Sequence, residues 1–133
     1  MPVISITRLR VRSWRFMPAF AVYAIQTRKQ ALNAPGNRGV DLRPEPGNVF
    51  WTASAWDSEA ALKQYMMAGA HGRAMPKLMN WCDEASVARW HQETATLPTW
   101  QEAHRRMQSE GRRSKVRFPS AAHERFEFPP PRA

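Results

Sequence analysis

The feature that most constrains this chain is the order in which strand-like and helix-like segments follow one another. Residues 3–14 alternate with the period of two that is typical of a strand, and residues 49–56 form the clearest strand of the sequence. Residues 16–32 instead carry apolar side chains at steps of three and four, which predicts an amphipathic helix. Pro18 falls in its first turn, where proline is tolerated, and the Ala-Pro-Gly run at 34–36 ends it.

A second helix is expected after residues 49–56, with Asp57 or Ser58 as its N-cap. Three residues that weaken helices follow along its length: Gly69, Gly72 and Pro76. We therefore expect a kink or break near residues 68–71, before the helix resumes through Leu78 and Trp81.

Two further strands and a third helix complete the pattern. Residues 37–43 and 85–91 are the candidate strands. Thr99 and Glu102 have the spacing of a capping box, in which each side chain bonds a free amide at the start of a helix. The helix that they open is expected to end near Gly111.

The resulting order is β-α-β-β-α-β, which predicts an α+β fold of the ferredoxin-like type with two helices on one face of an antiparallel sheet. We expect residues 1–111 to form this domain with its extra C-terminal helix. Residues 112–133 are expected to form an extended, basic, proline-containing tail that wraps either the body of the protein or a partner. The helices leave the second sheet face uncovered, with Val87 and either Trp51 or Trp56 among its candidates. Pairing two such faces would bury them, so we expect a homodimer that closes a dimeric α/β barrel.

The charge is concentrated at the two ends. The chain has 133 residues and a net charge of +9, yet residues 1–40 carry seven basic side chains and no acid. A nucleic-acid partner is not expected, because no zinc-finger spacing, stacking signature or basic heptad is present. Binding of the basic ends to nucleic acid or to a membrane surface stays open as a third alternative. No run of 18 apolar residues predicts a membrane span, and we expect a cytoplasmic protein.

A resemblance to a known superfamily rests on the run Phe50-Trp51-Thr52-Ala53-Ser54-Ala55-Trp56-Asp57, followed by Ala61, Tyr65, Gly69-Ala70-His71 and Arg73-Ala74-Met75. These residues resemble the core of the dimeric α/β-barrel superfamily. Within it, residues 3–128 are similar to an uncharacterised bacterial family described as spheroidene-monooxygenase-like or antibiotic-biosynthesis-monooxygenase-like. The long glycine-rich insertion of the carotenoid enzyme is absent, since only the short segment 37–48 stands in its place.

The resemblance implies a small monooxygenase-like protein that acts on a hydrophobic polycyclic or polyene substrate. The alternative is a non-catalytic protein of the same fold that binds a hydrophobic small molecule. The cofactor is either none or haem. In haem-degrading members of the superfamily an asparagine, a tryptophan and a helix histidine do the work, and the position of that histidine here is Met75, one helical turn beyond His71.

His71 is the candidate catalytic residue, as a general base or a haem ligand; its alternative role is to cap the broken helix. Arg8, Arg10 and Arg12 share one strand face, where they line a cavity for an anionic group or lie at a wet rim. Aromatic side chains at these spacings belong mostly to a core, but Trp51 and Tyr65 are candidates to flank a flat ligand.

No metal site is expected, because no pair of histidines or cysteines has metal-ligand spacing. Cys82 precedes Asp83 and Glu84, whose charges raise the pKa of a thiol, so we interpret it as buried or inert. Hydrolase, kinase and dehydrogenase motifs are also absent.

Overall fold

The computed structural model describes residues 1–131, and its central layer is a five-stranded antiparallel sheet in the order β2-β3-β1-β4-β5. The strands are β1 (Val3–Val11), β2 (Asn37–Glu45), β3 (Val49–Trp56), β4 (Cys82–His91) and β5 (Arg112–Arg113). The helices are the 3-10 turn η1 (Trp14–Phe16), α1 (Met17–Leu32), α2 (Glu59–Met67), α3 (Gly69–Trp81), α4 (Trp100–Glu110) and α5 (Ala121–Arg125). The predicted ferredoxin-like α+β order is confirmed, with the second helix divided into α2 and α3.

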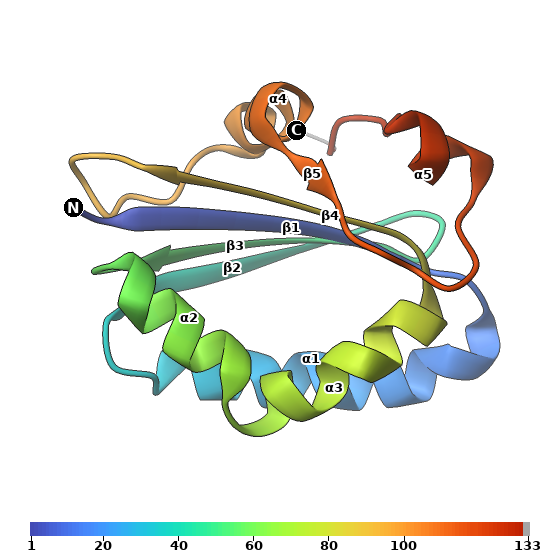
Figure 1. Ribbon diagram of the computed structural model, residues 1–133, viewed down its shortest axis with the longest axis horizontal. Helices are drawn as coiled ribbons and strands as arrows, with labels where there is room; N and C mark the ends of the chain where they lie inside the picture. The colour runs from blue at the N-terminus through green and yellow to red at the C-terminus, as the bar shows by residue number, and fades with distance from the viewer. Residues whose placement is uncertain (132–133) are drawn as a thin grey trace.

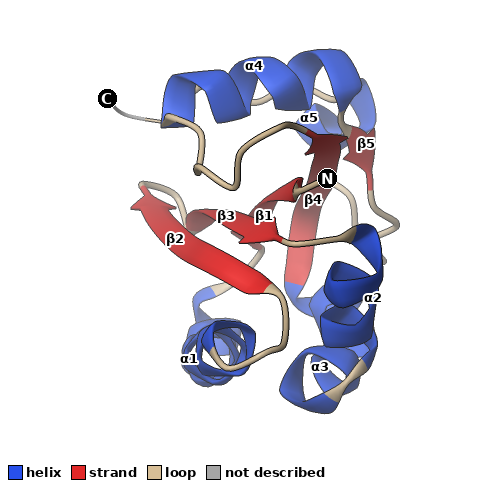
Figure 2. Ribbon diagram, turned by 90° about the vertical axis from the view of Figure 1, so that its left-hand side faces the viewer, coloured by secondary structure: helices blue, strands red, loops and turns tan. Residues whose placement is uncertain are grey.

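The helices lie in two layers on opposite sides of the sheet (Figure 1). One layer contains α1, α2 and α3, and the other contains α4 and α5 together with the C-terminal segment (Figure 2). We call the sheet face toward α1–α3 the inner face and the opposite one the outer face. Within residues 1–131, no helix has the length and apolar character needed to cross a membrane.

Strand β1 lies at the centre and sets the register of its two neighbours. Ser5 pairs with Ser54 of β3 and Thr7 pairs with Thr52, so these four small polar side chains share the inner face. Ile4, Ile6 and Arg8 alternate with them on the outer face.

The inner face packs against the helices in two separate clusters, one toward each end of β1. The first cluster contains Leu9, Val11, Phe20, Leu78, Cys82 and Ala85, and the second contains Val3, Ala31, Trp56 and Leu62. The polar rows of Ser5 and Thr7 lie between them. Because these short side chains fill little space, the middle of the sheet–helix interface is not packed solid.

The outer face is covered by the same chain. Ile4, Ile6 and Trp51 are buried there against Ala103 and Met107 of α4. Residues 126–128 add two phenylalanine rings, of which Phe128 meets Trp51 edge to face at 6.0 Å between ring centroids. The uncovered apolar face from which we inferred a homodimer is therefore absent in the described chain, and Val87 lies on the inner face instead. The dimer itself stays a prediction.

The C-terminal segment departs from the extended form expected for residues 112–133. It adds the short strand β5 to β4 and then forms α5, which Ser120 caps by accepting a hydrogen bond from the His123 amide at 3.0 Å. Residues 132 and 133 lie outside the described part. The segment follows the sheet because Phe126 and Phe128 are partly buried and pack against the outer cluster.

We predict that Met107→Ala destabilises the fold by about 2–5 kcal/mol, because Met107 is fully buried between α4 and the sheet. Urea unfolding followed by circular dichroism measures the change. The exposed Gln108→Ala on the same helix is the matched control and should stay within about 0.5 kcal/mol of the native protein. Equal values for the two variants would show that α4 does not pack on the sheet.

Candidate functional site

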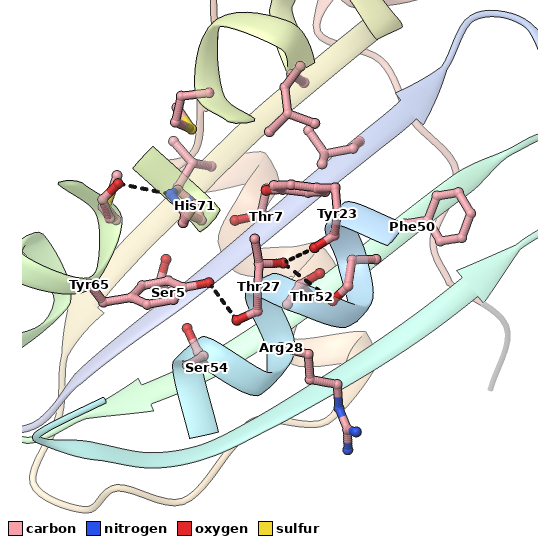
Figure 3. Close-up of a pocket in the computed structure, with 18 of the residues that line it drawn as sticks. Ser5, Thr7, Tyr23, Thr27, Arg28, Phe50, Thr52, Ser54, Tyr65 and His71 are labelled. Carbon is pink, nitrogen blue, oxygen red and sulfur yellow. Dashed lines mark hydrogen bonds between the residues drawn. The ribbon is translucent and has the colours of Figure 1, made fainter. Parts of the chain in front are cut away.

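A cavity of about 180 Å³ lies between the inner face of the sheet and helices α1–α3. Its floor holds the polar rows of Ser5 with Ser54 and Thr7 with Thr52, and helix side chains close it from the other side (Figure 3). The apolar part of its wall is formed by Leu9, Phe20, Ala24, Val40, Leu42, Phe50, Leu62, Met75, Leu78, Met79 and Val87. A mainly apolar chamber with a few polar groups is the usual form of a small-molecule site.

The break between α2 and α3 places His71 at this cavity, and it occurs where the glycines predicted it. Gly69 has a φ of +54°, a left-handed conformation that glycine adopts without strain. A Cβ at Gly72 would lie 2.6 Å from the carbonyl oxygen of Met67, so the returning chain needs glycine there too. The predicted break is thus confirmed, and its cause is close backbone packing.

Gln30 of α1 binds three backbone groups at the break. Its Nε2 donates to the carbonyl oxygens of Tyr65 at 3.1 Å and Ala68 at 2.8 Å. Its Oε1 accepts from the backbone amide of His71 at 2.9 Å. This one side chain therefore ties α1 to the end of α2 and to the start of α3.

The tautomer of His71 follows from its hydrogen bond. Nδ1 lies 3.0 Å from the carbonyl oxygen of Met66, and because a carbonyl only accepts, Nδ1 carries the proton. Nε2 then keeps its lone pair, and within residues 1–131 it has no hydrogen-bond partner. Burial lowers the pKa of His71 from its usual 6.5; the Met66 bond opposes this and the charge of Arg89 adds to it. The imidazole is therefore neutral at pH 7, as a general base must be.

Two tyrosines flank His71 on the helix side. The ring centroid of Tyr65 lies 4.9 Å from that of His71, and that of Tyr23 lies at 6.4 Å (Figure 3). Burial raises the pKa of Tyr65 to about 12, and its hydroxyl donates to the carbonyl oxygen of Thr27 at 3.3 Å. Burial likewise raises the pKa of Tyr23. Both phenols stay protonated at neutral pH and act as walls of the cavity.

Arg89 brings a positive charge to the cavity wall. It is paired with Ser5 across β4 and β1 and belongs to the inner face. Its Nη2 contacts the Met66 sulfur at 2.8 Å, while its buried Nε has no hydrogen-bond partner in the described chain. No carboxylate of residues 1–131 forms a salt bridge with it. An unpaired guanidinium at an apolar cavity favours a ligand with a negatively charged group.

The predicted site residues divide between the two faces. His71 and Tyr65 line the cavity, whereas Arg8, Arg10 and Trp51 belong to the outer face. The prediction that the arginine stripe shares a cavity with His71 is therefore wrong. The two-residue period of a strand places the arginines on one face of the sheet. Helices α1–α3, which line the cavity, cover the opposite, inner face.

The arginines are instead held by carboxylates and aromatic rings. Arg8 is 4% exposed and donates to Glu84 at 2.6 Å, and its guanidinium lies 5.6 Å from the ring centroid of Phe128. Arg10 bonds Asp83 at 3.1 Å and Glu84 at 3.3 Å. Burial raises the pKa of Glu84, but hydrogen bonds led by the one from Arg8 outweigh it and hold that pKa below its usual value. Ser120 also donates to Glu84 at 2.9 Å, so this cluster joins the C-terminal cover to the sheet. The buried Nε of Arg8 has no hydrogen-bond partner within residues 1–131.

Arg12 lies beyond the end of β1. Its Nε donates to the carbonyl oxygen of Asn80 at 2.6 Å, and its guanidinium lies 4.7 Å from the ring centroid of Phe16 and 4.5 Å from that of Phe118. It ties the start of the first helical layer to the C-terminal segment and does not line the cavity.

In the part of the chain that the structure describes, no group of three His, Cys, Asp or Glu side chains is arranged to hold a metal ion. Cys82 is fully buried at the start of β4. Burial, with a contribution from Asp83, raises the pKa of its thiol to about 12. The thiol is therefore protonated and unreactive at neutral pH, as the neighbouring acids predicted.

Three features of the cavity and of the helix break beside it were not predicted from the sequence. Arg89 shares one face of β4 with Val87 and Ala85. The period of two groups these side chains, but it does not show that the cavity lies on their side of the sheet. The role of Gln30 depends on the geometry of a break in another helix. The polar floor of the cavity consists of two cross-strand pairs, Ser5 with Ser54 and Thr7 with Thr52. It can be predicted only when the register between β1 and β3 is known.

Solved structures with the same fold define its class. Rv0793 from Mycobacterium tuberculosis superimposes with a TM-score of 0.64 at 16% identity, over 72% of this chain and 100% of that one. SnoaB from Streptomyces nogalater, a cofactor-independent oxygenase, gives 0.57 at 18% identity, over 74% and 98%. An antibiotic biosynthesis monooxygenase gives 0.61 at 13% identity, over 69% and 99%. The chain has the antibiotic-biosynthesis-monooxygenase-like fold; at these identities the likeness concerns the fold alone.

The chain belongs to the family DUF3291, a domain of unknown function, whose match spans residues 18–121. No curated protein matches the sequence significantly. The resemblance to antibiotic-biosynthesis-monooxygenase-like proteins is confirmed at the level of fold, while the spheroidene-monooxygenase-like assignment stays a prediction.

The lowered pKa of His71 predicts an acid-sensitive fold. In the unfolded chain His71 binds a proton near pH 6.5, but in the folded chain it does so only at lower pH. The contribution of neutral His71 to stability is therefore complete above pH 6.5 and is lost as the pH falls below 6.5. In His71→Gln the free energy of unfolding should fall less between neutral pH and about pH 5. Urea titrations at several pH values measure this. The exposed His91→Gln is the control, and an equal response of both variants would contradict the assignment.

Proposed function

We propose that this protein is a small monooxygenase that binds a compact, hydrophobic, ionisable aromatic molecule and oxygenates it without a bound cofactor. The observation that carries the proposal is the state of His71, a neutral imidazole with Nδ1 tied to the Met66 carbonyl and Nε2 unpartnered at an apolar cavity. The fold shared with a cofactor-independent oxygenase supports this class of activity.

The cavity restricts the substrate class. A volume of about 180 Å³ supports a compact ring system over an extended polyene. The aromatic walls suit a flat molecule, and Arg89 suits a group that becomes negatively charged. A hydroxylated polycyclic compound with an acidic methylene group combines these properties.

In the proposed reaction, Nε2 of His71 takes a proton from the methylene carbon, and the electron pair of the C–H bond is left on the substrate as an enolate. Arg89 stabilises this anion. Molecular oxygen accepts the electrons and bonds to the carbon, and the resulting peroxide takes the proton back from His71. Loss of water then breaks the O–O bond and the second C–H bond, so that the methylene becomes a carbonyl and the other oxygen atom leaves as water.

Haem fits these residues poorly. The cavity is smaller than the roughly 300–1,000 Å³ of ordinary ligand pockets. Met75, the position at which the resemblance places a haem-binding histidine, has no such side chain. We therefore derive no step through haem. A titration of the protein with ferric haem should leave its Soret band unchanged, and an equal response of His71→Ala would exclude ligation by His71.

Oxygen uptake with a panel of hydroxylated polycyclic compounds tests the proposal. The purified protein should consume oxygen with one member of the panel, and His71→Gln should lower kcat about 100-fold or more, because a general base contributes at least that much. Mass spectrometry with ¹⁸O₂ should place one labelled atom in the product.

His91→Gln is the matched control and should keep the native rate, since His91 is exposed and outside the cavity. Ligand affinity, followed by calorimetry, separates binding from chemistry in His71→Gln. Binding without turnover in the native protein would contradict the oxygenase and favour the non-catalytic carrier. Turnover that survives His71→Gln would refute the role of His71 alone.

A further inference from the structure

An apolar stripe runs along the solvent side of η1 and α1. Trp14 is 76% exposed, Val22 54%, Ile25 70% and Leu32 50%. They recur at steps that bring residues onto one side of a helix, and α1 alone is about 24 Å long. The stripe contains four of the large apolar side chains that the described chain exposes. Contiguous exposed apolar surface of this kind marks a contact site.

The composition of α1 strengthens this point. From Met17 to Ile25 the helix has no charged residue on any side. Its inner side, with Phe20 and Tyr23, is buried against the sheet, while its outer side is equally apolar and has no covering element. A helix that is apolar all round is normally covered on all sides. The outer side of α1 is therefore a surface without its partner.

The charges beside the stripe are all positive. Helices α1 and α3 contain Arg28, Lys29, Arg73 and Lys77 and no acidic residue. Within residues 1–131, none of these four forms a salt bridge, whereas the neighbouring Lys63 of α2 pairs with Glu59. Arg28 is exposed and also lines the cavity (Figure 3). The helical layer thus combines exposed apolar groups with uncompensated positive charge.

A groove between α1 and α2 adds to this charge. Lys29 and Arg73 line it together with the side chains of Gln26, Asn33 and Gln64, and no carboxylate lines it. Its donors and cations are suited to a phosphate group. The groove adjoins the stripe at Leu32, because Lys29 lies in the last turn of α1 and Asn33 is the C-cap of that helix.

We propose that this layer, with Trp14, Ile25 and Lys29 at its centre, docks on the surface of an anionic lipid bilayer. Apolar side chains enter the acyl boundary, Trp14 lies at the interface that tryptophan prefers, and the cations meet lipid phosphates. A second copy is disfavoured by charge, because a symmetric pair would bring together two faces whose unpaired charges on α1 and α3 are all basic. Nucleic acid supplies phosphates but offers no apolar phase for Val22 and Ile25.

Co-sedimentation with lipid vesicles tests the docking. The full chain should bind vesicles of phosphatidylcholine mixed with phosphatidylglycerol at physiological salt, and pure phosphatidylcholine much more weakly. Lys29→Glu should lower the partition coefficient about five-fold or more, since each cation near such a surface counts for about that factor. Ile25→Glu should lower it as well.

Matched controls carry the same charge changes elsewhere. Lys115→Glu mirrors Lys29→Glu, and Gln108→Glu mirrors Ile25→Glu; both sites are exposed and lie outside α1 and α3. Neither control should lower the partition coefficient as much as its counterpart. Equal losses would show that net charge alone drives binding and would overturn the proposal, as would the absence of sedimentation or a preference for duplex DNA over vesicles.

Trp14 reports the orientation. Among the six tryptophans it is the one that is exposed, so lipids brominated in their acyl chains should quench its fluorescence on binding. Trp14→Phe should abolish the quenching. Quenching that persists in Trp14→Phe would place another face on the bilayer and refute the proposal, whatever the outcome of the oxygen-uptake assay.

Discussion

The alternation of side chains along β1 is the constraint on which the rest of the structure depends. This strand is hydrogen-bonded on both sides, so its register decides which residues of β3 and β4 meet the helices. A slip of one residue would bring Arg8 under α1 and expose Ser5 and Thr7 to α4. The small polar rows leave room for a cavity, and the large apolar side chains opposite anchor the C-terminal cover.

The elements could be predicted because each depends on local chemistry. Pro18 starts a helix, Ser58 and Thr99 cap two others, and Gly69 with Gly72 divides the second helix. The prediction of a break also brought His71 into view, since a histidine beside two glycines has an unusual backbone environment. Ser58 and Thr99 accept hydrogen bonds from the third amide beyond each cap, as their sequence positions indicated.

The site was harder to predict because period two divides residues into sets without saying which set faces a cavity. The sequence pattern correctly places Arg8 and Arg10 together, but their face of β1 is not the one that lines the cavity. Arg89 lies on the cavity side of the sheet, and no sequence pattern singled it out. The decisive contact was distant in sequence: Phe128 lies against Trp51 and Arg8, and no local pattern in a proline-containing tail predicts that packing. Gln30 is similar, because its three hydrogen bonds join residues about 35–41 positions apart.

The buried thiol of Cys82 has a practical consequence. It is the single cysteine of the chain, and it lies fully buried in the cluster that joins β4 to α1 and α3. An alkylating reagent reaches it only when the sheet and the helical layer separate. The labelling rate of the unmodified protein therefore reports how often this interface opens in solution. Slower labelling in the presence of a bound molecule would measure how strongly an occupied chamber holds the two layers together.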